Sequence, residues 1–258
     1  MQGLHLTADL RGCAAGRPEM TEPASLRRCC LAAVAEAGLT PVGTLEDKPV
    51  AVVQGFGPEV GWKLLAEAAL AVRAGATWVA TNTDRTLPSP RGPLPGNGSL
   101  VAVLRTALNR EPDVVVGKPQ PALFTTAAAL SNAQRPLAVG DRLDTDIEGA
   151  VGAGMDSLLV LTGVSGPAEL LSAPESRRPK YVAADLAGLF RPETSARIPY
   201  DGDELGGWQI TRAQATVTLT GDGDPVDALR LLTGPAWSGA TVEAGSDSAR
   251  SLLKSWGV

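Results

Sequence analysis

Three carboxylates lie within six residues of one another, where a predicted strand ends and a predicted helix begins. The apolar run 136–139 stops at Gly140, and Asp141, Asp144 and Asp146 follow before an Ala/Gly-rich helical pattern. Acids in a first helical turn commonly satisfy free N–H groups and complement the positive end of the helix dipole. That explanation suits Asp144 or Asp146. It suits Asp141 less well, because Asp141 directly follows a glycine at the end of the strand.

The end of a strand is also a place where charge can do chemistry. In an open α/β sheet, ligands bind at the carboxyl ends of the strands. Several carboxylates that converge there repel one another unless a cation lies between them, and carboxylate oxygens are the hard ligands that Mg²⁺ prefers. The acidic cluster therefore indicates a site for a divalent cation.

Polar residues also follow two earlier predicted strands. Asn82 and Asp84 come after one strand, and Lys118 comes after another, before a turn that two prolines stiffen. Taken alone, Lys118 is most simply a solvated lysine. Beside a pair of cation-binding carboxylates, however, a fixed lysine helps to neutralise the charge on a transferring phosphoryl group, which is what phosphoryl chemistry requires.

The elements that position these residues alternate between strands and helices. Short apolar runs bounded by Gly, Pro or polar residues indicate strands, and apolar residues at a helical period indicate helices. This alternation predicts an α/β fold with a parallel sheet, and the apolar character of the strands indicates a sheet covered on both faces. We expect strands at 49–56, 77–82, 113–118, 136–141, 157–163 and 181–185, and helices at 26–39, 61–76, 99–110, 121–132 and 146–154.

The composition changes after about residue 190. Residues 191–207 are rich in Pro, Gly and charge, which predicts a linker. Beyond it, apolar and polar residues alternate as they do in antiparallel strands, and two helical patterns follow. We therefore expect residues 208–258 to form a small α+β domain, with Trp208, Trp237 and Trp256 as its core.

The overall composition excludes several classes of protein. The chain has 258 residues, a net charge of −5, three cysteines and one histidine. The negative charge argues against a nucleic-acid-binding surface, and no apolar run approaches the roughly 20 residues of a membrane span. The cysteines form no disulfide framework, and the first residues are not a secretory signal, so we expect a cytoplasmic protein.

Five short motifs occur in a characteristic order: "TNTD", "LPGNGSLV", "GKPQP", "GDRLDTDI" and "LVLTGV". Through them, residues 51–164 resemble the haloacid dehalogenase (HAD) superfamily. They are most similar to the subgroup with a large α/β cap, which includes glycerol-3-phosphate and phosphoglycolate phosphatases. The resemblance implies a Rossmann-like HAD core with an α/β cap segment. The tail, residues 208–258, resembles the small acetyltransferase-like appendage of actinobacterial members.

The resemblance also implies roles for individual residues. Lys118 would steady the phosphate, Asp141 would bind Mg²⁺, and Asp146 would support the same metal site. Asn82 and Asp84 would belong to the cap, which closes over the substrate and sets specificity. The implied partner is a small phosphorylated metabolite, the implied activity is phosphoric monoester hydrolysis, and a homodimer is compatible with the family.

One part of the family pattern is not in this sequence. The family's chemistry begins with a "DxDGT" motif, whose first Asp attacks phosphorus and whose second acts as acid and base. The nearest string, "TADLRG" at 7–12, differs in residue type and lacks the flanking strand. We expect a truncated or frame-shifted chain in which native-like sequence resumes near Leu31, with weak Mg²⁺ binding and no activity of its own.

These expectations give the following organisation of the chain: a disordered or non-native leader at 1–25, the α/β cap segment at 26–112, the distal part of the HAD core at 113–190, the linker at 191–207 and the C-terminal domain at 208–258. A second function class stays open, in which the chain is a non-catalytic remnant or a module that binds a small molecule or a protein. The DNA upstream of codon 1 distinguishes the two, because a "DxDGT" sequence there supports the phosphatase.

Overall fold

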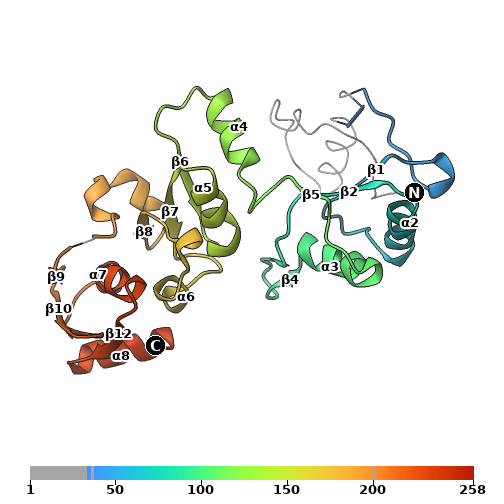
Figure 1. Cartoon of the computed structure of the whole chain (residues 1–258). Helices are drawn as coiled ribbons and strands as arrows, with labels where there is room; N and C mark the ends of the chain where they lie inside the picture. Colours follow the sequence, from blue (N-terminus) through green and yellow to red (C-terminus); the bar gives the residue numbers. More distant parts are fainter. Residues whose placement is uncertain (1–33, 36–37, 200) are drawn as a thin grey trace. The chain divides into compact units, whose positions relative to one another are not determined.

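The computed structural model describes residues 34–35, 38–199 and 201–258. The chain divides into two compact units, Met1–Leu123 and Phe124–Val258 (Figure 1). The predicted leader, 1–25, lies outside the described residues. So does most of the predicted helix at 26–39, of which residues 34–35 are helical.

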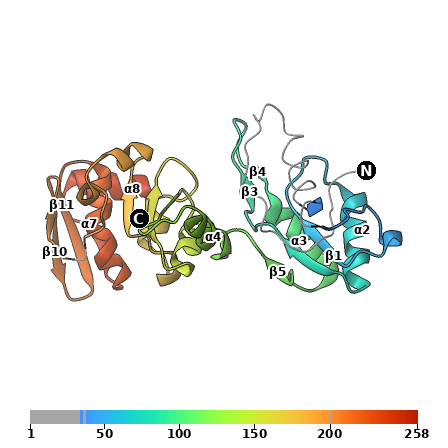
Figure 2. The ribbon, with the colours of Figure 1, turned by 90° about the horizontal axis from the view of Figure 1, so that it is seen from above.

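The first unit is built on a three-stranded parallel sheet in the order β1-β2-β5. Its core gathers apolar side chains from the sheet and two helices, with Val52, Trp78 and Leu104 almost wholly buried. The indole N–H of Trp78 donates to Gln54 Oε1 at 2.9 Å, so the buried Trp78 Nε1 has a hydrogen-bond partner. A hairpin of β3 and β4 projects from the unit (Figure 2). The elements are η1 (Leu45–Asp47), β1 (Ala51–Gln54), α2 (Trp62–Arg73), β2 (Thr77–Ala80), β3 (Thr86–Leu87), β4 (Leu94–Pro95), α3 (Asn97–Leu108) and β5 (Val114–Val115).

Strand β5 lies just after the expected boundary between cap and core at residue 112. It pairs with β2, with Val79 opposite Val114, and so it belongs to the sheet of the first unit. The alternation of strands and helices predicts that a strand exists here, but it does not say which sheet the strand joins. The two compact units divide after Leu123, and the boundary between cap and core stays a prediction.

The second unit contains another three-stranded parallel sheet, in the order β6-β7-β8. Strand β6 is followed by a π-helix that leads directly into α5, and the Phe124 ring of α4 lies against Gly149 of α5, where a Cβ would overlap the ring. The elements are α4 (Ala122–Leu130), β6 (Leu137–Gly140), η2 (Leu143–Ile147), α5 (Glu148–Gly152), β7 (Asp156–Val160), α6 (Pro167–Leu171), η3 (Glu175–Arg177), β8 (Tyr181–Ala183), η4 (Leu186–Phe190) and η5 (Glu193–Ser195).

The C-terminal residues form a separate sheet in the same unit. Strand β10 pairs antiparallel with both β9 and β11, whereas β11 pairs parallel with β12. Helix α7 runs through Gly234 and ends at Trp237, with Pro235 in its last turn. Pro235 supplies no N–H to the helix. The elements are β9 (Glu204–Leu205), β10 (Trp208–Ala213), β11 (Thr216–Gly221), α7 (Pro225–Trp237), β12 (Thr241–Ala244) and α8 (Asp247–Trp256).

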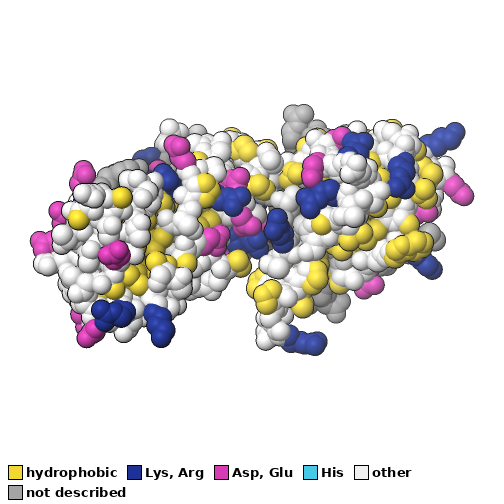
Figure 3. Space-filling view, turned by 60° about the horizontal axis from the view of Figure 1, so that its bottom comes forward, with side chains coloured by type: hydrophobic (Ala, Val, Ile, Leu, Met, Phe, Trp, Pro, Cys, Tyr) yellow, Lys and Arg dark blue, Asp and Glu magenta, His cyan; other side chains and the backbone are white. Residues whose placement is uncertain are grey.

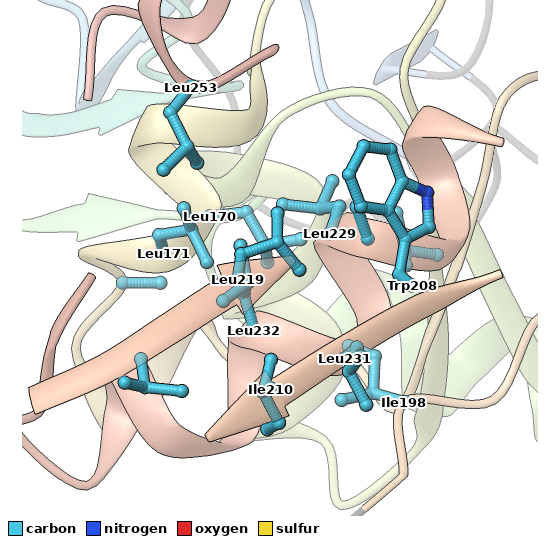
Figure 4. Close-up of a cluster of buried hydrophobic side chains, with 14 of the residues drawn as sticks. Leu170, Leu171, Ile198, Trp208, Ile210, Leu219, Leu229, Leu231, Leu232 and Leu253 are labelled. Carbon is cyan, nitrogen blue, oxygen red and sulfur yellow. The ribbon is translucent and has the colours of Figure 1, made fainter. Parts of the chain in front are cut away.

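The two sheets of the second unit share one apolar core. Trp208 is buried, and Trp237 and Trp256 pack against the same cluster while partly exposed. The predicted linker contributes Ile198 to this cluster, so it is packed against the unit over part of its length (Figure 4). The Pro, Gly and charged residues of the linker do not predict this packing, because a few buried positions suffice to anchor such a segment. The labelled members in Figure 4 are Leu170, Leu171, Ile198, Trp208, Ile210, Leu219, Leu229, Leu231, Leu232 and Leu253.

The surface carries both signs of charge. Lys and Arg side chains are interspersed with Asp and Glu on the face shown in Figure 3, with hydrophobic side chains between them. Trp62 and Phe190 are the most exposed large apolar side chains among the described residues. Within the described part of the chain, no helix combines the length and the apolar character needed to cross a membrane.

Candidate active site

The acidic cluster lies at the carboxyl end of β6, as the sequence predicts. Gly140 ends the strand, and a Cβ at this position would overlap the Asp146 side chain, so the absence of a side chain lets Asp146 fold back over the strand end. Asp146 Oδ2 accepts a hydrogen bond from the backbone N–H of Arg142 at 3.2 Å. The carboxylate is thus held by the turn that it follows, with 9% of the residue exposed.

Asp141 is held by the loop that follows the next strand. Its Oδ2 accepts from the Val164 N–H at 3.0 Å, and its carbonyl oxygen accepts from the Ser165 N–H at 2.9 Å. The Ser165 hydroxyl in turn accepts from the Leu143 N–H at 3.0 Å. Three hydrogen bonds therefore join the loop after β7 to the turn after β6, and they fix the Asp141 carboxylate at the strand end.

A π-helix carries the remaining acids. Single π-turns of this kind recur at functional sites. Here η2 buries Leu143 and Ile147 in the core, and it keeps Asp144 and Asp146 in its first turn. The Thr145 hydroxyl is buried without a hydrogen-bond partner among the described residues. The sequence predicts the helix and its acidic first turn, but not this wider geometry.

Arg142 and Asp144 form a two-point ion pair across the turn. The Arg142 guanidinium donates from Nε to Asp144 Oδ1 at 3.0 Å and from Nη2 to Oδ2 at 2.9 Å. Burial by itself raises the pKa of the Asp144 carboxyl, but the hydrogen bond and charge of Arg142, with the charge of Arg177, outweigh burial and hold the pKa below its usual value. Asp144 is therefore ionised at neutral pH and orients the Arg142 side chain.

Gly163 provides a test of how Asp141 is held. A Cβ at Gly163 would overlap the Asp141 carboxylate, whereas a Cβ at Gly166 meets no atom within 4 Å. The same substitution at the two positions should therefore have different effects. We expect Gly163→Ser to displace Asp141 and to cost about 1–3 kcal/mol of unfolding free energy, the range for overpacking, while Gly166→Ser changes it little because Ser suits the first position of α6.

Urea unfolding measures the cost, and the NMR shift of the Val164 amide reports the Asp141 hydrogen bond. Equal effects of the two substitutions would contradict the placement of Asp141 against Gly163.

The first unit brings the other three predicted site residues together. A Cβ at Gly117 would overlap the carbonyl oxygen of Thr81, so the backbone after β5 passes directly against the backbone after β2. Lys118 and Asp84 meet there, with Lys118 Nζ 3.8 Å from Asp84 Oδ2. Asn82 Oδ1 accepts from the Asp84 N–H at 3.2 Å. These three residues thus form one polar group at the carboxyl end of the sheet.

Asn97, in the "LPGNGSLV" segment, supports this group. Its Nδ2 donates to the Asn82 carbonyl oxygen at 2.7 Å and to the Gln54 carbonyl oxygen at 3.3 Å, and the side chain is buried. Asp84 Oδ1 is buried without a hydrogen-bond partner among the described residues. A buried carboxylate oxygen without a donor is unfavourable, so Asp84 has the capacity to hold a further donor.

The structure places the predicted residues in two groups. Asn82, Asp84 and Lys118 lie in the first unit, and Asp141 and Asp146 lie in the second. That Lys118 converges with Asp141 and Asp146 at one strand-end cleft stays a prediction. Ser165 and Asn97 were not among the predicted site residues. Their only signal is that each lies in or beside a motif already singled out.

The acids present make only part of a metal site. Among the described residues, no group of three or more His, Cys, Asp or Glu side chains comes close enough to hold a metal ion. Mg²⁺ prefers a nearly octahedral set of oxygens, of which proteins often supply only one or two carboxylates. Asp141 and Asp146 are therefore the right chemical type for such an ion, and they are incomplete as its only support.

Two family models match separate segments of the chain. Residues 115–189 match the HAD-hydrolase-like family, and residues 205–258 match the GCN5-related N-acetyltransferase like domain. A parallel sheet with carboxylates at the end of β6, within the segment that matches a hydrolase family, defines this part as a hydrolase core of the α/β class. The α/β fold class and the small α+β C-terminal domain are thereby confirmed.

Whole-chain comparisons extend this result. The chain is 44% identical over 243 residues to the D-glycerol 3-phosphate phosphatase of Mycobacterium tuberculosis, covering 87% of this chain and 67% of that protein. Its structure matches the crystal structure of a glycerol phosphate phosphatase from M. tuberculosis in complex with magnesium, with a TM-score of 0.79 and 46% identity, over 89% of this chain and 70% of that one. The chain belongs to the haloacid dehalogenase family of phosphatases, which confirms the resemblance.

Another relative is matched over a shorter segment. The 5′-nucleotidase YutF of Bacillus subtilis is 40% identical over 135 residues, which cover 52% of this chain and 51% of that protein. The chain thus spans about two thirds of one curated relative and about half of the other. Its own substrate and metal are therefore matters for proposal.

Proposed function

We propose that this chain is the distal part of a Mg²⁺-dependent phosphatase that acts on a small phosphomonoester such as glycerol 3-phosphate or phosphoglycolate. The observation that carries the proposal is the fixed position of Asp141 and Asp146 at the carboxyl end of β6, within the segment that matches the hydrolase family. The relatives support the substrate class, since one is a D-glycerol 3-phosphate phosphatase and another a 5′-nucleotidase.

Asp141 and Asp146 are the residues that would hold the metal. When bound, Mg²⁺ neutralises the charge of the phosphoryl group and of the oxygen that leaves. The chain's contribution is to keep both carboxylates in place. Asp141 is held by the Val164 N–H and Asp146 by the Arg142 N–H.

Lys118 would bind the phosphoryl group itself. Its ammonium lies beside Asp84, which positions it without enclosing it, since 37% of the Lys118 side chain stays exposed. Asn82 holds Asp84 through its backbone N–H, and so this cap group would place Lys118 and contribute to specificity. Lysine binds phosphate as a compact point charge, which suits a phosphoryl group whose oxygens reorient during transfer.

The chain as printed would lack the nucleophile of this reaction. The sequence contains no "DxDGT" motif. We assign the role of nucleophile to none of the residues at the strand ends. We therefore propose that turnover requires a segment bearing that motif. If no such segment joins the chain, it is a non-catalytic remnant or a binding module. Cytoplasmic location and a homodimer stay predictions.

A substrate panel tests the function. A segment that bears the "DxDGT" motif would be joined to the full chain, and the joined chain would be assayed with Mg²⁺. We expect the joined chain to hydrolyse glycerol 3-phosphate or phosphoglycolate in preference to a nucleoside 5′-monophosphate, because the chain's cap residues Asn82 and Asp84 set the specificity. Preference for the nucleotide would contradict the substrate class, and absence of any phosphatase activity in a folded joined chain would contradict the function.

A further inference from the structure

The C-terminal unit, by which we mean residues 205–258 of the second unit, matches an acetyltransferase-like family. Such a family implies a phosphate-bearing acetyl donor such as acetyl-CoA. A donor of that kind is commonly held by free N–H groups at the start of a helix. Helix α7 begins with Pro225, which has no N–H, and the next N–H, of Val226, donates to the Asp224 carboxylate at 2.8 Å. At α8, the Ala249 N–H donates to the Ser246 hydroxyl.

The charge at these helix starts is also of the wrong sign. Both starts open on one cavity, which is lined by Asp222 and Asp247. Carboxylates at these positions complement the helix dipoles by themselves and repel a polyanion. The described residues of the unit therefore do not fit an acetyl-CoA site.

What the unit does contact is α6. Leu170 and Leu171 of α6 are buried in the same cluster as Leu229 and Leu232 of α7, and Figure 4 shows these side chains side by side. The cluster has no break between the hydrolase sheet and the C-terminal sheet. Such a continuous core behaves as one cooperative unit, so the C-terminal residues stabilise the hydrolase part directly.

Two polar contacts fix α7 on the segment that contains α6. The indole N–H of Trp237 donates to the Leu170 carbonyl oxygen at 2.8 Å. Arg178 donates from Nη2 to the Trp237 carbonyl oxygen at 3.0 Å, and its guanidinium lies 5.1 Å from the centre of the Trp237 ring. Trp237 is thus held from both sides by groups of the hydrolase part, which specifies one position for α7 rather than a general apolar contact.

Helix α6 begins directly after the loop that holds Asp141. Gly166 is its first capping residue, and Val164 and Ser165 immediately precede it. Those two residues donate to the Asp141 carboxylate and carbonyl, and the Ser165 hydroxyl holds Leu143. A short chain of contacts therefore runs from Trp237 through α6 to Asp141.

We propose that the C-terminal acetyltransferase-like unit is a buttress for the Asp141 loop, with Trp237 as a positioning residue, and not a site for an acetyl donor. The inference rests on the proposed function only for the use of Asp141 as a metal ligand. The mechanical link from Trp237 to the loop is a property of the folded chain, and it is measured without substrate or metal.

Hydrogen exchange of single amides tests the link. Trp237→Phe removes the indole N–H that reaches Leu170 and keeps most of the apolar ring, so we expect the Ser165, Val164 and Leu143 amides to exchange about three- to tenfold faster, as the loss of one hydrogen bond implies. The Ile210 and Leu219 amides, in the C-terminal sheet, should change less. Trp256→Phe, at the end of α8, is the matched control and should leave the loop amides unchanged.

The outcomes separate the proposal from a general loss of stability. Faster exchange confined to the loop amides supports the buttress. Uniform acceleration of all amides in both variants, or no change in the loop amides of Trp237→Phe, would overturn it. Neither result bears on hydrolysis, which the substrate panel measures separately.

A binding measurement tests the statement about the acetyl donor. Calorimetric titration of the full chain with acetyl-CoA up to about 1 mM should show no saturable heat, because micromolar or tighter binding would be evident at that concentration. Saturable binding that weakens in Trp208→Phe, a substitution in the cavity wall, would overturn the assignment of the unit as a buttress alone.

Discussion

Phosphate release from glycerol 3-phosphate by this chain alone should be negligible, at least about 10²–10⁴-fold slower than release by the chain joined to a "DxDGT" segment. This range is the usual contribution of a positioned general acid or base, and loss of the nucleophile removes the covalent route as well. Both proteins would be assayed with Mg²⁺ at equal concentration by colorimetric detection of phosphate.

Substitutions at the strand-end residues complete this experiment. In the joined chain, Asp141→Ala should reduce turnover to background at the Mg²⁺ concentration of the assay. Lys118→Ala should mainly raise the KM for the phosphomonoester, because the ammonium binds the phosphoryl group. Asp203→Ala, on an exposed ion pair with Arg212, is a control that should change neither. Equal rates for the joined and unjoined chains, both abolished by Asp141→Ala, would show that a nucleophile lies within these 258 residues.

The sequence was sufficient to predict the fold class because the signals for it are local. Each strand of the two parallel sheets coincides with a predicted apolar run, as at Thr77–Ala80 and Asp156–Val160. Helix α2 follows its apolar period, with Ala68 and Val72 buried. Patterns of this kind depend only on neighbours within a few residues, which is why they are readable from one sequence.

The partners of the site residues depend on contacts between distant segments, and these were not readable. Nothing in the pattern shows that Asp141 would be held by Val164, or that Gly163 makes room for its carboxylate. The types of the site residues could be predicted from their place at strand ends, whereas their hydrogen bonds depend on the packing of two loops. The π-helix is a further case, since its apolar positions also fit an α-helix.

The position of the C-terminal unit was unreadable for the same reason. A change in composition near residue 190 predicts a new domain, and the separate sheet of β9 to β12 agrees with that. Yet Leu170 and Leu229 belong to one core, and the Pro-rich segment between them supplies Ile198 to it. Composition reports how a segment differs from its neighbours, but it does not report which surfaces are buried against each other.

One buried arginine carries much of the attachment of α7 to the predicted linker. Arg230 donates to Asp227 Oδ1 at 2.7 Å, to the Thr194 carbonyl oxygen at 2.6 Å and, from two nitrogens, to the Arg197 carbonyl oxygen at 3.0 and 2.8 Å. Its side chain is only 6% exposed. A buried guanidinium needs a partner for its charge and for its N–H donors. Here most of the hydrogen bonds go to backbone carbonyl oxygens of the linker.

Arg230→Met should therefore cost about 2–5 kcal/mol of unfolding free energy, more than the removal of an exposed charge from the same unit. The substitution leaves the Asp227 carboxylate and two carbonyl oxygens without their donor. Arg250→Met is the matched control: Arg250 pairs with Asp247 at the same helical spacing on α8, but its side chain is 66% exposed, so the cost should stay below about 0.5 kcal/mol. Urea unfolding followed by tryptophan fluorescence measures both. A cost for Arg230→Met as small as that of the control would mean that the linker is not anchored through this side chain.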